Sequence, residues 1–357
     1  MQARRDGPRY PSNRTPTPLA GTTAGQFTSE IRTVQALRAA ACMMVVGYHT
    51  LQTAAGEGAI TAWPNGSAGV DLFFVISGFV MLGSTRRLAA RPNAAWIFLR
   101  RRAARLVPLY WLLTGIKYAI ATAAPGMAPH TKLSFFNLLA SLLFIPVRDL
   151  TGQIRPVLPV GWSLNFEVFF YLLFAAALAL RIRVWWVLPA LTATALAGFF
   201  RTPSWPAPFA LANGMVLEFA AGMLVWAIAA SGWATRAPLA MALMAACVAL
   251  LLTLPLAGSW RFLVWGGPAA AILLAAVALE SRCSAKLPRG LLAVGDASYA
   301  IYLLHPFVVP ALAGHGWAAA LAAIPLSAAA GLVVHACLDA PLQRRARGFT
   351  QSVARAA

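Results

Sequence analysis

Long apolar segments separated by short polar stretches dominate the pattern along this chain. An α-helix needs roughly 17 to 25 mainly apolar residues to cross a bilayer, so each long segment predicts one spanning helix. We expect ten spans, at residues 34–53, 68–84, 104–123, 161–180, 184–200, 209–230, 237–256, 262–279, 291–312 and 317–338. The apolar segment 134–146 is shorter, which favours a re-entrant or interfacial helix. The predicted fold is an all-α polytopic membrane protein, a bundle of about ten transmembrane helices with one short additional helix.

The distribution of positive charge supports this count and orients the bundle. The chain has 29 Lys and Arg residues against 10 Asp and Glu residues. With ten spans and both termini in the cytoplasm, most basic residues lie on the cytoplasmic side, as the positive-inside rule requires. An eleventh span at 134–146 would make the split much more even. The positive charge therefore belongs to the membrane edges, and we expect a lipid bilayer and no nucleic acid as partner.

Composition excludes several other classes of protein. Hydrophobic residues make up 60% of the chain and charged residues only 11%, far from the balance of a soluble domain. The four cysteines are widely spaced, so we expect neither a disulfide framework nor a structural zinc site. No GxGxxG, Walker or GxSxG motif is present, which disfavours nucleotide-binding folds and serine hydrolases.

The ends of the chain differ from its middle. Residues 1–30 combine Arg with Pro, Thr, Ser and Gly and have no apolar signal region, which predicts a disordered cytoplasmic tail. Residues 31–341 form a single membrane domain, and residues 342–357 are predicted to be a basic cytoplasmic tail.

Ionisable side chains inside spans are costly, so each one is a candidate functional residue. His49 follows Arg38 by eleven residues in the first span, which places both on one helix face about 16 Å apart along the axis. This arrangement predicts a cationic cytoplasmic entrance with an imidazole deeper in the membrane. A packing histidine and a snorkelling arginine are the alternatives.

Two further arginines, Arg102 and Arg105, share one face at the start of the third span. Their guanidinium groups suit a polyphosphate ligand. Contact with lipid phosphates is the alternative explanation for such a cluster.

Carboxylates are predicted at the outer side of the bundle. Glu167 lies about one and a half turns into the fourth span, and Asp71 lies at the outer end of the second, where both could face one vestibule. Asp71 could bind sugar hydroxyls, pair with a nearby cation, or simply be hydrated at the interface. Glu218, in the sixth span, has no partner that the sequence reveals.

The ninth span carries a polar stripe. Ser298, Tyr302 and His305 are spaced i, i+4, i+7 and therefore lie on one helix face. Pro306 follows directly and loosens the helix beside these groups.

Taken together, five ordered motifs resemble the membrane acyltransferase-3 family, and most closely its exopolysaccharide and glycan O-acetyltransferases. They are the Arg38-x10-His49 pair, "GVDLFFVISGF", "RRAARLVPLY", "GWSLNFEVFFY" and "SYAIYLLH", and they extend over residues 32–341. One departure is Asp339-Ala340-Pro341, where the family usually has Glu-x-Pro.

The resemblance implies an enzyme of the bacterial inner membrane that transfers an acyl group, usually acetyl, to a glycan. The donor would be cytosolic acyl-CoA, a co-substrate rather than a bound cofactor, and the acceptor a hydroxyl on a cell-surface or lipid-linked sugar. By motif, His49 would be the catalytic histidine, and Arg38, Arg102 and Arg105 would bind acyl-CoA. Glu167 and Asp71 would line the acceptor side, and Glu167 could also orient the imidazole.

Two chemical routes and one rival function remain open at this stage. His49 could act as general base on the acceptor hydroxyl or could carry the acyl group itself. The rival is a proton-coupled transporter or flippase of a lipid-linked sugar, with His49, Glu167 and His305 as a proton relay.

Overall fold

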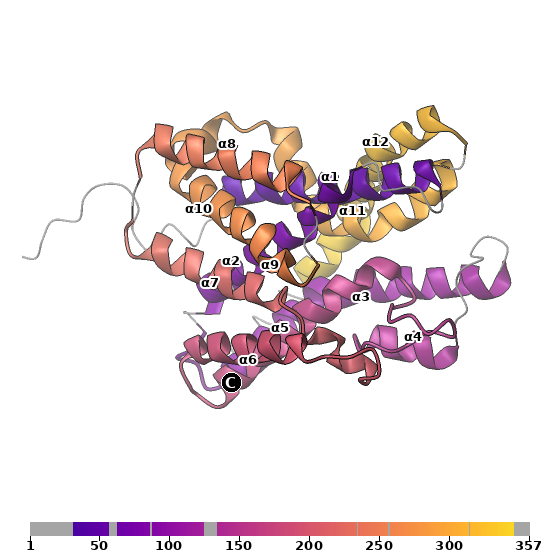
Figure 1. Cartoon of the computed structure of the whole chain (residues 1–357), viewed down its shortest axis with the longest axis horizontal. Coiled ribbons are helices and arrows are strands. Elements are labelled where there is room, and N and C mark those ends of the chain that lie inside the picture. The colour runs from indigo at the N-terminus through magenta and orange to yellow at the C-terminus, as the bar shows by residue number, and fades with distance from the viewer. Residues whose placement is uncertain are drawn as a thin grey trace, which may run out of the picture.

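The computed structural model describes residues 31–56, 63–85, 88–124, 134–233, 235–255, 258–313 and 315–345. Within these ranges the chain is helical apart from loops and one isolated β-bridge. Figure 1 shows most helices lying side by side in one bundle. The α-helices are α1 (Arg32–Ala55), α2 (Gly69–Thr85), α3 (Ala94–Ala123), α4 (Phe135–Leu142), α5 (Trp162–Ala179), α6 (Val187–Phe199), α7 (Val216–Ala230), α8 (Ala237–Thr253), α9 (Arg261–Val264), α10 (Gly266–Cys283), α11 (Arg289–Ala313) and α12 (Trp317–Val334).

Each predicted span contains a helix of the structure, so the all-helical class is confirmed. Among the described residues, six helices are long and apolar enough to cross a membrane, and three more are apolar but shorter. The number of ten crossings therefore stays a prediction. Helix α4 has only 8 residues, too short to cross a hydrocarbon core of about 30 Å.

Helix α1 lies at the centre of the packing. It contacts α2, α10, α11 and α12, and glycines allow the closest approaches within the bundle. The α2–α7 contact is the clearest case. A Cβ atom on Gly222 would lie 1.9 Å from the Val75 carbonyl oxygen, and one on Gly78 would lie 2.0 Å from that of Phe219. Small residues of this kind let membrane helices pack backbone to backbone.

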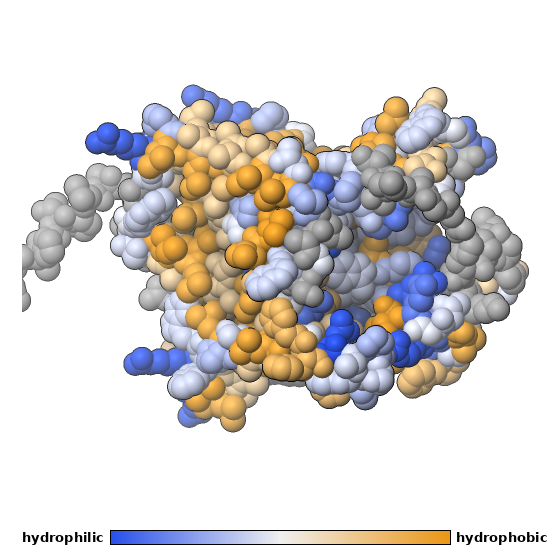
Figure 2. All heavy atoms as spheres, in the orientation of Figure 1, coloured by the Kyte–Doolittle hydropathy of each residue, from blue (hydrophilic) through white to orange (hydrophobic). Residues whose placement is uncertain are grey.

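Apolar and polar side chains are distributed as a membrane protein requires. Large apolar side chains are exposed on the outside, among them Phe200 (77% exposed), Leu180 (70%) and Phe136 (65%). Figure 2 shows apolar residues gathered over α8 and α10, whereas polar residues surround a hollow between the α12 end and α3. Several ionisable groups are instead buried in the bundle, namely Asp71, Glu218 and His305.

The loop before α5 is closed by a buried carboxylate. Asp149 accepts hydrogen bonds from the backbone amides of Thr151 and Gln153, and Arg155 Nε donates to its Oδ2 at 3.0 Å. Burial alone would raise the pKa of Asp149, but these hydrogen bonds outweigh it and hold the pKa below its ordinary value. The loop therefore depends on an ionised Asp149.

Helix α12 continues through a π-helical turn, His335–Asp339. Asp339 bonds to His335 Nδ1 and Gln343 Nε2, each at 2.8 Å, so the acid of the altered Glu-x-Pro motif has partners in its own helix. The predicted N-terminal tail at 1–30 lies outside the described residues, as does the C-terminal tail beyond residue 345.

Candidate active site

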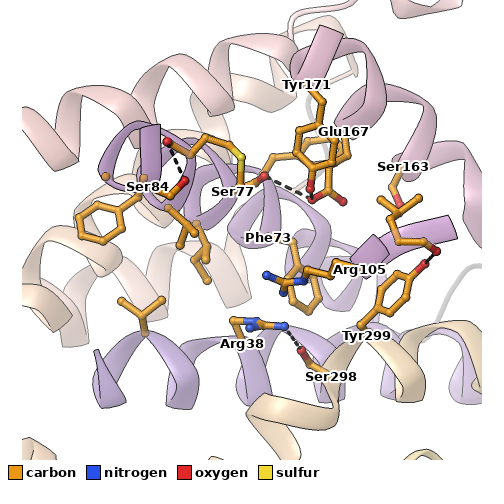
Figure 3. A pocket seen from close by; sticks show the side chains of 18 of the residues that line it. Arg38, Phe73, Ser77, Ser84, Arg105, Ser163, Glu167, Tyr171, Ser298 and Tyr299 are labelled. Carbon is orange, nitrogen blue, oxygen red and sulfur yellow. Dashed lines mark hydrogen bonds between the residues drawn. The ribbon is translucent and has the colours of Figure 1, made fainter. Parts of the chain in front are cut away.

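One elongated cavity of about 560 Å³ runs between α1, α2, α3, α5 and α11. Its lining follows α2 from Val70 to Ser84, a length of about 21 Å at 1.5 Å per residue. Figure 3 shows polar side chains from several of these helices entering it. A space of this shape fits a long, narrow ligand better than a compact one.

One end of the cavity is strongly basic. Arg38 on α1 lines it together with Arg101 and Arg105 on α3. Arg38 donates to Gln35 Oε1 at 3.1 Å and to Ser298 Oγ at 3.0 Å, so hydrogen bonds fix its guanidinium group. In Figure 3 the guanidinium groups of Arg38 and Arg105 both point into the cavity. Because no carboxylate forms a salt bridge with these two arginines within the described residues, this end can bind an anionic group.

Arg102 differs from its neighbour Arg105, although the sequence places both on one face. Its side chain is not part of the cavity lining. It donates to Ser84 Oγ at 2.9 Å and lies over the ring of Phe98, 5.6 Å from its centre. Arg102 therefore holds α3 against α2 beside the basic end.

Glu167 lines the same cavity from α5, across from the arginines. It accepts hydrogen bonds from the Tyr171 hydroxyl and, at 3.4 Å, from Ser77 Oγ. Within the described residues no hydrogen bond joins Glu167 to His49. Glu167 and Asp71 also do not share one site, contrary to the expected common vestibule, because Ser77 lies about 9 Å along α2 from Asp71.

The polar stripe on α11 forms another wall. Ser298 accepts a hydrogen bond from Arg38, and Tyr302, one helical turn further along α11, also lines the cavity. The Tyr302 hydroxyl donates to the Val160 carbonyl at 3.0 Å and is 2.8 Å from Ser163 Oγ, so it is fixed to the start of α5. All three residues of the stripe are buried.

The two intramembrane histidines form a stacked pair just beyond Tyr302. The ring centres of His49 and His305 are 5.1 Å apart at an interplanar angle of 29°. Tyr302 is one turn before His305, with ring centres 5.8 Å apart. Neither histidine lines the cavity, and His49 is half-buried whereas His305 is 1% exposed. The pair therefore lies outside the cavity, next to Tyr302.

Asp71 is bound to a cation. Arg261 Nη2 donates to its Oδ2 at 2.7 Å and Arg261 Nε to its Oδ1 at 2.9 Å. The carboxylate is completely buried, which rules out simple hydration at the interface. Arg261 also bonds to the Ser67 carbonyl and lies over the Trp265 ring, 4.8 Å from its centre. Of the roles expected for Asp71, the structure matches pairing with a nearby cation.

Glu218 belongs to the same buried cluster. It is 1% exposed and interacts electrostatically with both Asp71 and Arg261. A side chain on Gly266 would come within 2.8 Å of Glu218 Cγ, so this glycine leaves the room that the acid occupies. Arg261 therefore interacts with both carboxyl groups, Asp71 and Glu218.

Some site residues were not predicted from the sequence. Tyr171 is four residues after Glu167 and therefore on the same helix face, a local signal that could have identified it. Gln35 and Ser77 are isolated polar side chains among mainly apolar ones, and Arg261 belongs to none of the motifs. Within the described residues no group of three metal-ligating side chains is present.

Comparison with known proteins gives matches over most of the chain. A family model described as an acyltransferase domain matches residues 31–338. The "Exopolysaccharide production protein ExoZ" of Rhizobium meliloti (strain 1021) is 36% identical over 298 residues, which cover 79% of this chain and 91% of that protein. The "Acyltransferase MdmB" of Streptomyces mycarofaciens is 27% identical over 276 residues, 68% of each chain. No solved structure matches the chain. The range matched by the family model contains every side chain of the cavity and the histidine pair.

Proposed function

Because the chain belongs to the acyltransferase family, we propose that it transfers an acyl group, in the first instance acetyl, from cytosolic acyl-CoA to a hydroxyl of a cell-surface or lipid-linked glycan. The observation that carries this proposal is the elongated cavity with arginines at one end and a histidine pair beyond the other. The name of the exopolysaccharide-production relative supports a glycan as acceptor. The enzyme would lie in the bacterial inner membrane with both termini in the cytoplasm.

The cavity accounts for the donor. The phosphates of acyl-CoA would bind Arg38, Arg101 and Arg105, whose guanidinium groups match phosphate geometry. The narrow pantetheine arm would then extend along α2 past Ser77 and Glu167. This direction brings the thioester to Tyr302, next to the histidine pair. Glu167, together with Tyr171, would contribute polar contacts along the arm.

His49 supplies the base. The acceptor oxygen would attack the thioester carbonyl while an unprotonated ring nitrogen of His49 takes the hydroxyl proton. Breaking the carbon–sulfur bond would release the CoA thiolate, which takes that proton back from His49, so the histidine ends the cycle unchanged. General base catalysis of this kind contributes typically about 10²- to 10⁴-fold in rate. In the alternative route His49 would carry the acyl group itself, first accepting it from acyl-CoA and then passing it to the acceptor hydroxyl.

The test is transfer of radiolabelled acetyl groups in proteoliposomes. Acetyl-CoA is supplied at the cytoplasmic face, and a glycan extract stripped of its esters by mild alkali serves as acceptor. We expect label on the glycan with wild type and none with His49→Ala. His315→Ala, which removes an exposed histidine far along the chain from the cavity, is the matched control and should be fully active. Full transfer by folded His49→Ala would refute the role of His49, and no label on the glycan with folded wild type would refute the proposed acyl transfer.

A further inference from the structure

A second cavity, of about 380 Å³, lies at the surface between two loops that are far apart in the sequence. One wall is the loop between α2 and α3, and the other is the turn between α5 and α6. Three exposed arginines line it: Arg91 from the loop, and Arg181 and Arg183 from the turn. The proposed acyl transfer uses none of them.

The positive charge of the second cavity is not compensated by nearby acids. Neither loop has an Asp or Glu within ten positions of its arginines. None of the salt bridges in the described part of the chain involves the three arginines. Guanidinium groups bind phosphate through paired hydrogen bonds, so a phosphate-bearing group matches this cavity best.

The backbone at Arg181 is unusual for an arginine. Its φ is 54°, in the left-handed region, and its N–H donates to the Leu178 carbonyl at 3.2 Å as α5 ends. Glycine is the residue usually found at this position, because a Cβ atom makes the left-handed conformation unfavourable. Helix termination therefore does not account for an arginine here. The positive-inside rule does not account for it either, since that rule concerns the number of basic residues on one side and not where they meet.

An apolar stripe on α5 ends at the same turn. Four exposed residues are spaced i, i+4, i+7, i+8 and therefore share one helix face: Leu172, Ala176, Ala179 and Leu180. Trp185 and Trp186, which follow the arginines, are also exposed, and tryptophan is enriched where headgroups meet hydrocarbon. A basic cavity at the end of a lipid-facing stripe suits an amphipathic ligand. A free phosphate ion would contact the arginines but not the stripe.

We propose that the second cavity binds the phosphate-bearing headgroup of an anionic phospholipid, whose acyl chains lie along the exposed face of α5. The phosphate joins the loop that carries Arg91 to the turn that carries Arg181 and Arg183. With the N-terminus in the cytoplasm, the chain returns to the cytoplasmic side after α2 and again after α5, so the lipid belongs to the cytoplasmic leaflet. The inference concerns the protein in its membrane and does not depend on acyl transfer.

The test is native mass spectrometry of the full chain in micelles of a neutral detergent, with equal amounts of phosphatidylglycerol and phosphatidylcholine added. We expect wild type to retain phosphatidylglycerol in preference to phosphatidylcholine. A basic residue at an anionic membrane surface contributes roughly a fivefold change in affinity. The triple variant Arg91→Gln/Arg181→Gln/Arg183→Gln should therefore bind phosphatidylglycerol about 10²-fold more weakly.

The matched control removes the same charge from other exposed positions. It should retain phosphatidylglycerol as wild type does, and it is the triple variant Arg236→Gln/Arg282→Gln/Arg289→Gln.

Arg181→Gly separates lipid binding from folding, because glycine suits the left-handed conformation. Without lipid, this variant should unfold at or above the wild-type temperature. It should nevertheless bind phosphatidylglycerol about fivefold more weakly, and added phosphatidylglycerol should raise its Tm less than that of wild type.

Several results would overturn the inference. One is equal retention of the two lipids by wild type, and another is wild-type retention in the variant that lacks the three arginines of the cavity. Equal loss in the control variant would overturn it too, since retention would then follow net charge. Inorganic phosphate, compared with chloride at equal ionic strength, distinguishes the source of the phosphate. If phosphate alone displaced phosphatidylglycerol and raised the Tm of wild type as much, the cavity would be a site for free phosphate and not for lipid.

Discussion

Replacing Arg261 tests how the buried charge cluster is balanced. Arg261 makes three hydrogen bonds to Asp71, and the two side chains are 17% and 0% exposed. Removing one partner of a buried ion pair costs about 3 to 5 kcal/mol, because the other charge stays behind without compensation. Arg261→Met leaves the buried carboxylate of Asp71 with no cation. We therefore expect Arg261→Met to lower the free energy of unfolding by an amount within that range.

Asp71→Asn should be milder, by the same reasoning. Arg261 is 17% exposed and the Asn side chain keeps one acceptor oxygen, so we expect a cost of about 1 to 3 kcal/mol, near that of an unpaired buried group. The double variant Arg261→Met/Asp71→Asn should be more stable than Arg261→Met alone, because it removes the uncompensated charge of Asp71.

The assay is unfolding of purified protein in mixed micelles by SDS titration, followed by tryptophan fluorescence. Arg201→Met, which removes an exposed arginine, is the control and should change the free energy of unfolding by less than about 0.5 kcal/mol. Equal effects of Arg261→Met and Arg201→Met would refute the reasoning. Strict additivity in the double-variant cycle would also refute it, since contacting charges must be coupled.

Three other changes are expected to have distinct effects. Arg38→Gln and Arg105→Gln should each raise the KM for acetyl-CoA about tenfold or more with a smaller change in kcat, measured from initial rates; an unchanged KM would exclude both from donor binding. Gly222→Ala should lower thermal stability by about 1 to 3 kcal/mol or more, because its Cβ would lie 1.9 Å from a backbone oxygen, whereas Gly267→Ala, with open space around it, should not. The Asp149 pKa is lowered, so its hydrogen bonds stabilise the fold above about pH 4 and are lost as pH falls through the lower folded-state value. Asp149→Asn should therefore lower thermal stability near pH 7 and show a smaller loss than wild type between about pH 5 and pH 3; parallel losses would contradict this.

The helices were predictable because their signal is local. Hydropathy depends on neighbouring residues, and every apolar segment that we identified contains a helix. The predicted helix boundaries were less accurate where a helix extends through charged residues. Helix α3 begins at Ala94, ten residues before the predicted span at 104–123, because its arginine-rich first turns still make backbone hydrogen bonds. Hydropathy indicates the part that suits lipid, not the full length of the helix.

Contacts within one helix face were also predictable. Arg38 and His49 were expected on one face, and both contact α11, through Ser298 and His305 respectively. Pairings between distant segments were not predictable, because no spacing rule links residues that far apart. Asp71 and Arg261 are separated by 190 positions. The same holds for Glu167 and His49, which belong to different helices, so no spacing rule relates their positions.

The end of the cavity next to Tyr302 also matters for the membrane around the protein. A cell membrane stores ion gradients, which a continuous aqueous path through the bundle would dissipate. Tyr302 stands at that end with its hydroxyl fixed to the start of α5, and the Phe73 ring lies 6.1 Å from its own, centre to centre. Under the proposed function, the side chains that receive the thioester would also have to keep ions from leaking through the bundle. Only an acyl group of a few atoms then has to pass them, while the membrane keeps its charge.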